Sequence, residues 1–534
     1  MESTAAAIQD WLRPLTISND TLKALTLQLS STYKHLALHS DNQFLPTPVT
    51  RLPNGKEKGL YLAIDFGGSN LRIAFVNLLG AGKPPEGGGQ KGHHDAHTVL
   101  TSADDSYAAC FASYHERSWS IEERLKADNA DDLFRWVGGC LAQVIQEYIW
   151  DVQWSSNDRA SMPEEIPLGI TFSFPMIQTT LSRATLMPMG KGFTVGSKLD
   201  LASMVLAGYG NDRCLPRLKI LAITNDAVAT LVSLTYAAGL EPCGKAVAGL
   251  ILGTGTNAAV AMDAALLNES KRPSLWQNLE GQQVVVNTEW TINGVAAPLR
   301  DMDIITRWDE TLDEALSAPG FQPFESLTAG KYLGEIVRLV VLEYFLKRLK
   351  LKKESLPPFL LCHYGMTTEF LARVVATSDN ASDLAARLTQ GDHFPNSNHF
   401  FWTPKLAEVL RLTERAVIRR SVCLIGAAVV GLLGATGDLD LMGRVYKPQM
   451  NGVVEGTSKP SKKLIVAYLG GLIMQYRGYK EQTQSVINLL LGDFISHECE
   501  SSVQLVEAAK GGLFGAAALA ASATLGHVSE NQLR

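Results

Sequence analysis

Residues 60–79 read LYLAIDFGGSNLRIAFVNLL, and this stretch decides the fold of the chain. Two short apolar runs flank a pair of glycines, Gly67 and Gly68. Apolar runs of this length that are separated by a glycine turn predict a β-hairpin. A second stretch, AGLILGTGTNAAVAM at residues 248–262, repeats the plan of apolar run, glycine turn and apolar run. The repeat predicts two related lobes with a cleft between them.

The first turn carries groups that suit phosphate binding. Asp65 lies near the end of the first apolar run, and the glycines let the backbone come close to a ligand. Backbone N–H groups and polar side chains can then hold phosphates, with the carboxylate of Asp65 near a metal ion. The polar side chains are those of Ser69, Asn70 and Arg72. An ordinary hairpin turn is the alternative interpretation of these eight residues.

The second turn resembles a different motif only superficially. GTGTNA at residues 253–258 fits the G-x-G-x-x-A pattern of dinucleotide-binding sites. The residues that follow, AVAMDAALL, predict a strand, whereas that site requires the N-terminus of a helix. We therefore discount a dinucleotide site. The sequence also has no G-x-x-x-x-G-K-[ST] motif, so it has no P-loop.

The remaining pattern alternates strands and helices, as an α/β protein does. Residues 1–58 predict a helical lead-in, and residues 168–174, 218–224 and 462–469 predict strands. Two Gly- and Pro-containing segments, residues 81–97 and 451–463, predict surface loops. Helices are expected at residues 121–149, from Asp226 onward, at 328–349, 382–388 and 403–433, with two more before the end of the sequence.

Composition excludes several classes of protein. The chain has 534 residues, of which 46% are hydrophobic and 19% charged, so most of it can bury a core. The 48 basic and 54 acidic residues give a net charge of -6, which argues against binding to nucleic acid or an anionic membrane. Seven scattered cysteines without a C-x-x-C pair indicate reduced thiols, so we expect the cytosol, with the nucleus as the alternative. The apolar stretches at 422–436 and 511–525 are expected to be buried helices.

Several isolated polar residues are candidates for chemistry. Asn225 and Asp226 stand where an apolar strand changes to a helix, so the carboxylate can accept a proton from a substrate hydroxyl. A helix N-cap is the alternative interpretation of this pair. Glu289 and Glu325 are acids near aromatic residues, and Lys191 lies in MGKGF. Taken singly, each of these three is more simply a solvated side chain.

Seven ordered segments together resemble the fungal and animal hexokinases and glucokinases. The clearest is FLPTPVTRLPNGKEKGLYLAIDFGGSNLRIAF at residues 44–75. The others are LGITFSFP (168–175), GKGF (190–193), ITNDAVATL (223–231), GLILGTGTNA (249–258), VVVNTEW (284–290) and FESLTAGKYLGEIVR (324–338). The resemblance implies an α/β, actin-like ATPase (ribonuclease H-like) fold of two lobes around a hinged cleft. It also implies a large lobe from residues 1–61 plus 221–513 and a small lobe from residues 62–220 plus 514–534.

The resemblance further implies an activity and its site. We expect a kinase that transfers the γ-phosphate of MgATP to the 6-hydroxyl of a hexose such as glucose, with Asp226 as catalytic base. The set that resembles the sugar-binding residues is Ser173, Lys191, Asn225, Asp226, Asn257, Glu289 and Glu325. The set that resembles the ATP-binding residues is Asp65, Gly67, Gly68, Ser69, Asn70, Arg72, Thr254, Gly255, Gly330, Lys331, Gly470 and Gly471. Asp65 would act on Mg²⁺ through water, and the protein would be a monomer or homodimer.

Three departures from the family pattern leave two other functions open. Met189-Gly190 replaces Trp-Thr beside Lys191, which makes room for a 2-acetamido group and suggests an N-acetylglucosamine kinase. Leu469-Gly470-Gly471 replaces Asp-Gly-Ser, and the late Gly-Ser-Gly-x-Gly-Ala-Ala run is reduced to GGLFGAA at residues 511–517. These two changes fall on the nucleotide side. They suggest a weakly active or inactive sugar-sensing regulator.

Overall fold

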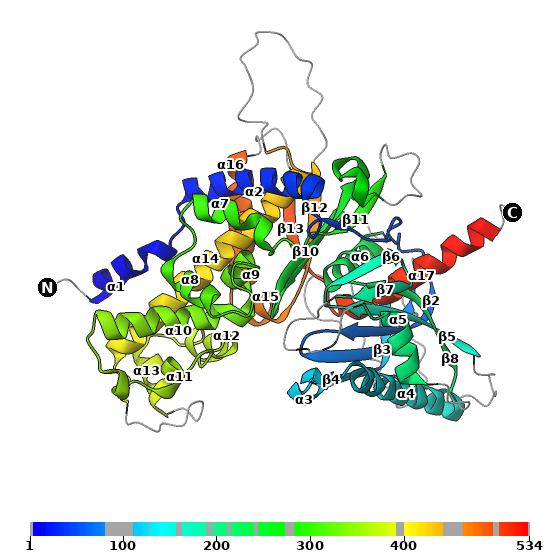
Figure 1. Ribbon diagram of the computed structural model, residues 1–534, viewed down its shortest axis with the longest axis horizontal. Coiled ribbons are helices and arrows are strands. Elements are labelled where there is room, and N and C mark those ends of the chain that lie inside the picture. The colour runs from blue at the N-terminus through cyan, green and yellow to red at the C-terminus, as the bar shows by residue number, and fades with distance from the viewer. Residues whose placement is uncertain are drawn as a thin grey trace, which may run out of the picture.

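The structure is a computed structural model, and it describes most of the chain in two lobes (Figure 1). The predicted loop at 81–97, the segment around Lys191 and all but the last residue of the predicted loop at 451–463 lie outside the described residues. The described residues are 4–80, 110–127, 129–155, 163–187, 193, 195, 198–210, 215–239, 244–272, 282–390, 400–441, 463–494 and 501–531.

A five-stranded sheet forms the centre of one lobe, and its strand order is β4-β3-β2-β5-β8. The stretch that opens with Gly59 folds as the predicted antiparallel hairpin, in which Asp65 pairs with Arg72. Strands β5 and β8 then run parallel to β2. The strands are β2 (Gly59–Phe66), β3 (Asn70–Leu78), β4 (Phe111–Ser120), β5 (Glu165–Phe172) and β8 (Arg217–Thr224).

The six-stranded sheet of the other lobe repeats this topology. Its order is β1-β11-β10-β9-β12-β13, so its last five strands follow the same 3-2-1-4-5 arrangement as the first sheet, and β1 is added at the edge. The second glycine turn joins an antiparallel pair, as predicted, and two parallel strands follow. The strands are β1 (Leu45–Pro46), β9 (Lys245–Leu252), β10 (Thr256–Asp263), β11 (Gln283–Asn287), β12 (Lys463–Leu469) and β13 (Ser502–Glu507).

Two helices cross between the lobes. Helix α6 (Asp226–Ala238) follows the last strand of the five-stranded sheet and packs on β9, β10 and β12 of the other sheet. Helix α17 (Gly511–Asn531) follows the last strand of the six-stranded sheet and packs on β2, β5 and β8. The two helices also pack on each other. Each sheet is therefore covered by the helix that its partner sheet supplies.

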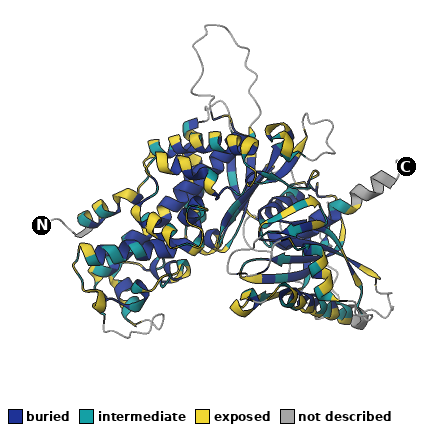
Figure 2. Cartoon of the chain, in the orientation of Figure 1, coloured by how far each residue is buried: buried dark blue, intermediate teal, exposed yellow. Residues whose placement is uncertain are grey.

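Helix α14 (Pro404–Thr436) is the buried centre of the helical part of the larger lobe, shown in dark blue in Figure 2. It packs against α2 (Asn19–His39), α10 (Gly330–Lys347) and α16 (Tyr479–Phe494). Within the described residues it alone is long and apolar enough to cross a membrane, but 89% of its most apolar window is buried inside the chain. Its apolar residues are therefore core residues, as the sequence predicted for 422–436.

The other helices complete the two lobes. Residues 121–149, which were predicted to be a single helix, contain two helices, α3 (Glu123–Ala127) and the start of α4 (Ala130–Ser155). The final stretch, which was predicted to be helical, is interrupted by β13. The short strands β6 (Met176–Thr180) and β7 (Arg183–Leu186) form a separate hairpin. The remaining helices are α1 (Thr4–Leu12), α3 (Glu123–Ala127), α4 (Ala130–Ser155), α5 (Leu201–Tyr209), α7 (Ala296–Asp301), α8 (Arg307–Glu314), α9 (Pro323–Thr328), α11 (Pro358–Leu361), α12 (Thr368–Phe370), α13 (Ala381–Gln390) and α15 (Gly471–Gln475).

The predicted lobe boundaries stay a prediction. They fall after residues 61, 220 and 513, and each of these positions lies inside an element, namely β2, β8 and α17. A continuous strand or helix therefore runs across every predicted boundary. This arrangement fits a chain that passes repeatedly between two lobes.

A buried ion pair anchors α14 to α8. The guanidinium of Arg420 is fully buried and donates two hydrogen bonds of 2.7 Å to the carboxylate of Asp309. We predict that Asp309→Ala lowers the free energy of unfolding by about 3–5 kcal/mol, because it leaves a buried charge without a partner. Denaturant unfolding measures this loss. The neighbouring exposed variant Glu310→Ala is the control, and equal stability of the two variants would contradict the prediction.

Candidate functional site

One cleft of about 2660 Å³ collects the residues singled out in the sequence. The parallel strands β2, β5 and β8 of one sheet and β9, β12 and β13 of the other all point their carboxyl ends at it. The carboxyl ends of parallel strands are the usual place for a ligand in open α/β sheets. Every predicted sugar-binding and ATP-binding residue lines this cleft except Lys191, which lies outside the described residues.

The first glycine turn joins β2 and β3 at the wall of the cleft. It is closed by a hydrogen bond of 2.9 Å from the Gly67 N–H to the Asn70 carbonyl oxygen. The side chains of Ser69 and Asn70 are exposed and Arg72 is half-buried, so all three can reach a ligand. The turn therefore has the open backbone that the sequence indicated.

Asp65 is a perturbed acid of the cleft. Its side chain is only 15% exposed, and its Oδ2 lies 3.7 Å from Nη1 of Arg72. Burial raises the pKa of Asp65 to about 6; Arg72 counteracts this shift and the negative charge of Asp226 adds to it. Gly512 makes the position possible, because a Cβ atom there would come within 2.5 Å of the Asp65 carboxyl carbon. A buried carboxylate beside a second one is a suitable neighbour for a cation.

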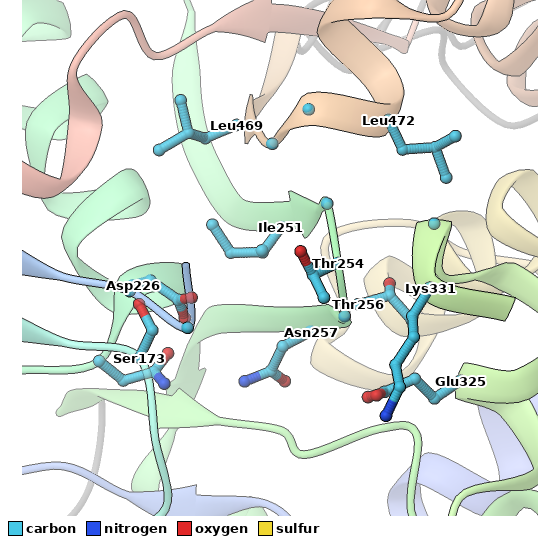
Figure 3. A pocket seen from close by; sticks show the side chains of 18 of the residues that line it. Ser173, Asp226, Ile251, Thr254, Thr256, Asn257, Glu325, Lys331, Leu469 and Leu472 are labelled. Carbon is cyan, nitrogen blue, oxygen red and sulfur yellow. The ribbon is translucent and has the colours of Figure 1, made fainter. Parts of the chain in front are cut away.

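Asn225 and Asp226 lie at the start of α6. The sequence allowed this pair to be either a helix N-cap or a site of proton transfer, and the structure is compatible with both. The side-chain oxygen of Asn225 accepts a hydrogen bond of 2.8 Å from the Ala227 N–H, so Asn225 is the N-cap. One carboxylate oxygen of Asp226 accepts from the same N–H, also at 2.8 Å. Figure 3 shows the Asp226 and Ser173 side chains at the cleft. The helix N-terminus stabilises negative charge on Asp226.

A chain of three polar side chains crosses the floor of the cleft. The Nδ2 of Asn257 donates to Oδ1 of Asn287 at 2.9 Å, and the Nδ2 of Asn287 donates to Oε1 of Glu289 at 2.8 Å. Asn257 also approaches Glu289 at 3.4 Å. Glu289 has a φ of 46°, which is strained for a residue with a side chain, and the Gln43 side chain holds its carbonyl oxygen at 2.9 Å. Asn287 therefore fixes the side-chain orientations of two predicted sugar ligands.

Glu325 lies on α9, across the cleft from Asp226 in Figure 3. Its Oε2 accepts hydrogen bonds from Thr291 at 3.4 Å and from Gln322 at 3.5 Å. A Cβ atom on Gly255 would lie 3.5 Å from the same carboxylate, so the second glycine turn packs directly against it. These contacts place Glu325 at the junction of the predicted sugar and nucleotide sides.

The nucleotide side is built by backbone groups and apolar side chains. The carbonyl oxygen of Gly253 accepts from the Gly330 N–H at 2.9 Å, which ties the second turn to the start of α10. Gly470 has a φ of 129°, and a Cβ there would lie 2.3 Å from the Leu252 carbonyl oxygen. Figure 3 shows apolar side chains along this wall, those of Ile251, Leu469 and Leu472. The carboxylate and hydroxyl expected from the family pattern are replaced here by Leu469 and Gly471.

The residues present fit a magnesium nucleotide. Gly67 and Gly512 leave the space that phosphates and the Asp65 carboxylate need, and Arg72 supplies positive charge. Mg²⁺ is usually held by one or two carboxylates together with substrate phosphates. Asp226 is close enough to Asp65 for its negative charge to raise the pKa of Asp65. These two carboxylates are the groups that would face the ion.

Sequence reasoning missed several residues of the site. Asn287 precedes Glu289 by two positions, but β11 ends at Asn287 and Glu289 has a positive φ, so strand alternation does not relate the two residues. Gly512 was noticed only as part of a small-residue run, because its contact with Asp65 joins segments far apart in the chain. Thr291 and Gln322 carried no signal, since their role depends entirely on the placement of Glu325.

Comparison with known proteins agrees with this architecture. Two family models described as hexokinase match residues 7–236 and 247–522, which together cover most of the chain. Hexokinase-7 of Oryza sativa subsp. japonica is 28% identical over 498 residues, covering 89% of this chain and 87% of the relative. Hexokinase-1 of Arabidopsis thaliana is 27% identical over 532 residues, covering 97% and 90%.

Solved structures show the same fold. The hexokinase from Schistosoma mansoni, complexed with glucose, has a TM-score of 0.71 and 24% identity, with 98% of this chain and 100% of that chain covered. A second crystal structure of a hexokinase has a TM-score of 0.67 at 22% identity, covering 97% and 99%. The expected two-lobed α/β ATPase-like fold is therefore confirmed. The chain belongs to the hexokinase family, and its activity is the ATP-dependent phosphorylation of a hexose.

Proposed function

We propose that the protein transfers the γ-phosphate of MgATP to the 6-hydroxyl of glucose, with Asp226 as the base. The observation that carries this proposal is the convergence of Ser173, Asn225, Asp226, Asn257, Glu289 and Glu325 on one cleft that also contains the open glycine turns. Polar groups in this number suit a ligand covered with hydroxyls. The glucose bound by the Schistosoma mansoni hexokinase supports glucose as the first sugar to test.

Asp226 is the best-placed proton acceptor. One of its oxygens is occupied by the Ala227 N–H, and no hydrogen bond to any residue that the structure describes holds the other. The free oxygen takes the proton from the hydroxyl as that hydroxyl oxygen bonds to the γ-phosphorus and the bond from phosphorus to the leaving oxygen breaks. Since such a transition state is loose, alignment and charge neutralisation supply most of the rate.

The phosphate side is organised around the first glycine turn. Backbone N–H groups of the turn other than that of Gly67, which bonds to Asn70, hold the negative charge of the nucleotide together with the guanidinium of Arg72. Mg²⁺, when bound, would neutralise charge on the phosphates, and Asp65 would hold it through water. Movement of the two lobes toward each other would exclude water, which otherwise competes with the sugar as acceptor.

Two alternatives rest on particular features. An N-acetylglucosamine kinase is suggested by Gly190, which the family pattern fills with a larger residue. A sugar-sensing regulator of low activity is suggested by Leu469 and Gly471 on the nucleotide wall. An ADP-release assay with MgATP and a panel of glucose, fructose, mannose, glucosamine and N-acetylglucosamine separates them. Preference for glucose supports the main proposal, preference for N-acetylglucosamine supports the first alternative, and sugar binding without ADP release supports the second.

We also propose that the protein acts in the cytosol as a monomer or homodimer, without a membrane or nucleic-acid partner. The burial of α14 inside the chain supports the absence of a membrane role. The net charge of -6 supports the absence of a nucleic-acid role. Among the described residues, Cys110, Cys140 and Cys423 are buried and form no disulfide, which suits a reducing compartment.

The first prediction concerns Asp226. Asp226→Asn keeps the shape of the side chain but removes the proton acceptor, so kcat should fall by about 10² to 10⁴. Glucose affinity, measured by calorimetry, should change by only a few-fold. The exposed variant Asp301→Asn is the control, and a kcat near the wild-type value in Asp226→Asn would show that another group is the base.

The second prediction concerns pH. Because burial raises the pKa of Asp65 to about 6, kcat/KM for ATP should fall as the pH drops below about 6, where the carboxylate becomes protonated. The contribution of Asp65 to stability changes in the opposite sense. Its pKa is about 6 in the folded chain and 3.8 in the unfolded chain, so the folded state binds the proton more tightly and gains stability as the pH falls. Protonation of Asp65 therefore does not itself destabilise the fold.

A pH profile from pH 5 to 8 checks this prediction. Asp65→Asn should have low activity without the inflection near pH 6. The prediction is contradicted if Asp65→Asn keeps the inflection, or if the wild-type profile is flat across that range.

The third prediction concerns Asn287. Asn287→Ala removes both hydrogen bonds that orient Asn257 and Glu289, so KM for the sugar should rise about tenfold, corresponding to roughly 1.4 kcal/mol. The melting temperature should change little more than in Asn77→Ala, a half-buried strand asparagine outside the cleft. Steady-state kinetics and thermal unfolding measure both quantities. A shift in melting temperature without a change in KM would make Asn287 a purely structural residue.

A further inference from the structure

A second, smaller cavity of about 350 Å³ lies beside the cleft. We call it the arginine pocket, because Arg415, Arg419 and Arg477 line it, together with Glu414, Tyr476 and Gln482. Arg415 and Arg419 are one turn apart on α14, and Arg477 follows α15. Tyr476 lines both this pocket and the main cleft, so the two are neighbours.

The three arginines of the pocket are exposed and unpaired. None of them makes a salt bridge with a residue in the described part of the chain. Other arginines on the same helix do find partners, since Arg411 pairs with Glu408 at 2.8 Å and Arg420 pairs with Asp309 at 2.7 Å. The lack of partners is therefore a property of this pocket and not of the helix.

The one carboxylate that lines the pocket among the described residues, Glu414, interacts with the charge of Arg415 and so offsets only part of the charge of the three arginines. Glu414 is buried, and its Oε1 accepts a hydrogen bond from the Tyr476 hydroxyl. The carboxylate is thus directed to the pocket wall and engaged there. With Gln482 as an uncharged neighbour, the pocket carries a net positive charge.

This arrangement is costly without a ligand. Like charges at positions i and i+4 of a helix lie on the same face and repel each other. Guanidinium groups are planar forks of donors that match the oxygens of a phosphate two at a time. The volume is at the lower limit for small-molecule pockets, which leaves room for a phosphate with a small organic group.

We propose that the arginine pocket is a second anion site, which binds the dianionic phosphate group of inorganic phosphate or of a small phosphate monoester. The guanidinium groups of Arg415, Arg419 and Arg477 hold the phosphate oxygens. The amide of Gln482 donates a further hydrogen bond. The site is distinct from the phosphate-binding turns of the main cleft, with which it shares only Tyr476.

Calorimetry on the full chain tests the proposal, with inorganic phosphate and glycerol 3-phosphate as probes. All proteins carry Arg72→Gln, which weakens anion binding in the main cleft. In this background the pocket should still bind phosphate saturably, and Arg419→Gln with Arg477→Gln should weaken that binding at least tenfold. The control replaces Arg124 and Arg183 by Gln, two exposed arginines of the other lobe, with the same change of net charge.

The outcomes are decisive in either direction. Tighter binding of glycerol 3-phosphate than of phosphate would assign the site to a monoester, and equal binding would assign it to phosphate itself. Absence of saturable binding in the Arg72→Gln background would overturn the proposal. Equal weakening by the pocket and control substitutions would also overturn it, because the effect would then be one of net charge alone. Circular dichroism confirms that each variant is folded.

Discussion

The architecture depends on the close approach of two helices to two sheets, which glycine alone permits. A Cβ atom on Gly169 of β5 would lie 2.2 Å from the Ala516 carbonyl oxygen of α17, and one on Gly249 of β9 would lie 2.2 Å from the Ala227 carbonyl oxygen of α6. Where the helices meet, a Cβ on Gly515 would lie 2.1 Å from the Ala229 carbonyl oxygen. Side chains at these positions would push the helices away, because packed interiors have no spare volume.

The same helices bring the chemistry together. Helix α6 begins with Asp226, and α17 begins beside Asp65 of β2, so two acids from separate elements face one site. Burial and the proximity of the two carboxylates make the site unfavourable for negative charge, as the raised pKa of Asp65 shows. The close approach of the two carboxylates therefore lowers the stability of the fold, and a cation bound beside them offsets this loss. Thr171 holds the start of α17 in this position, because its hydroxyl donates a hydrogen bond of 2.8 Å to the Gly512 carbonyl oxygen.

Local patterns predicted the parts of the structure that depend on neighbouring residues. The two hairpins, the start of α6 at Asp226 and the buried α14 were all recognisable from apolar spacing and glycine position. The crossing of α6 and α17 between the lobes was not recognisable from these patterns, because no local signal indicates which sheet a helix will cover. Asn287 and Gly512 were missed for a related reason. Their partners are set by strand register and by contacts between residues 65 and 512, which only the folded chain defines.

The burial of α14 has a consequence for synthesis of the chain. This helix packs against α2, which precedes it by several hundred residues, and against α16, which follows it. During translation its apolar surface therefore emerges before α16 is available to cover part of it. Such surface is prone to aggregation until its partner arrives. The helix that stabilises the finished lobe thus exposes apolar surface on the nascent chain until α16 has been synthesised.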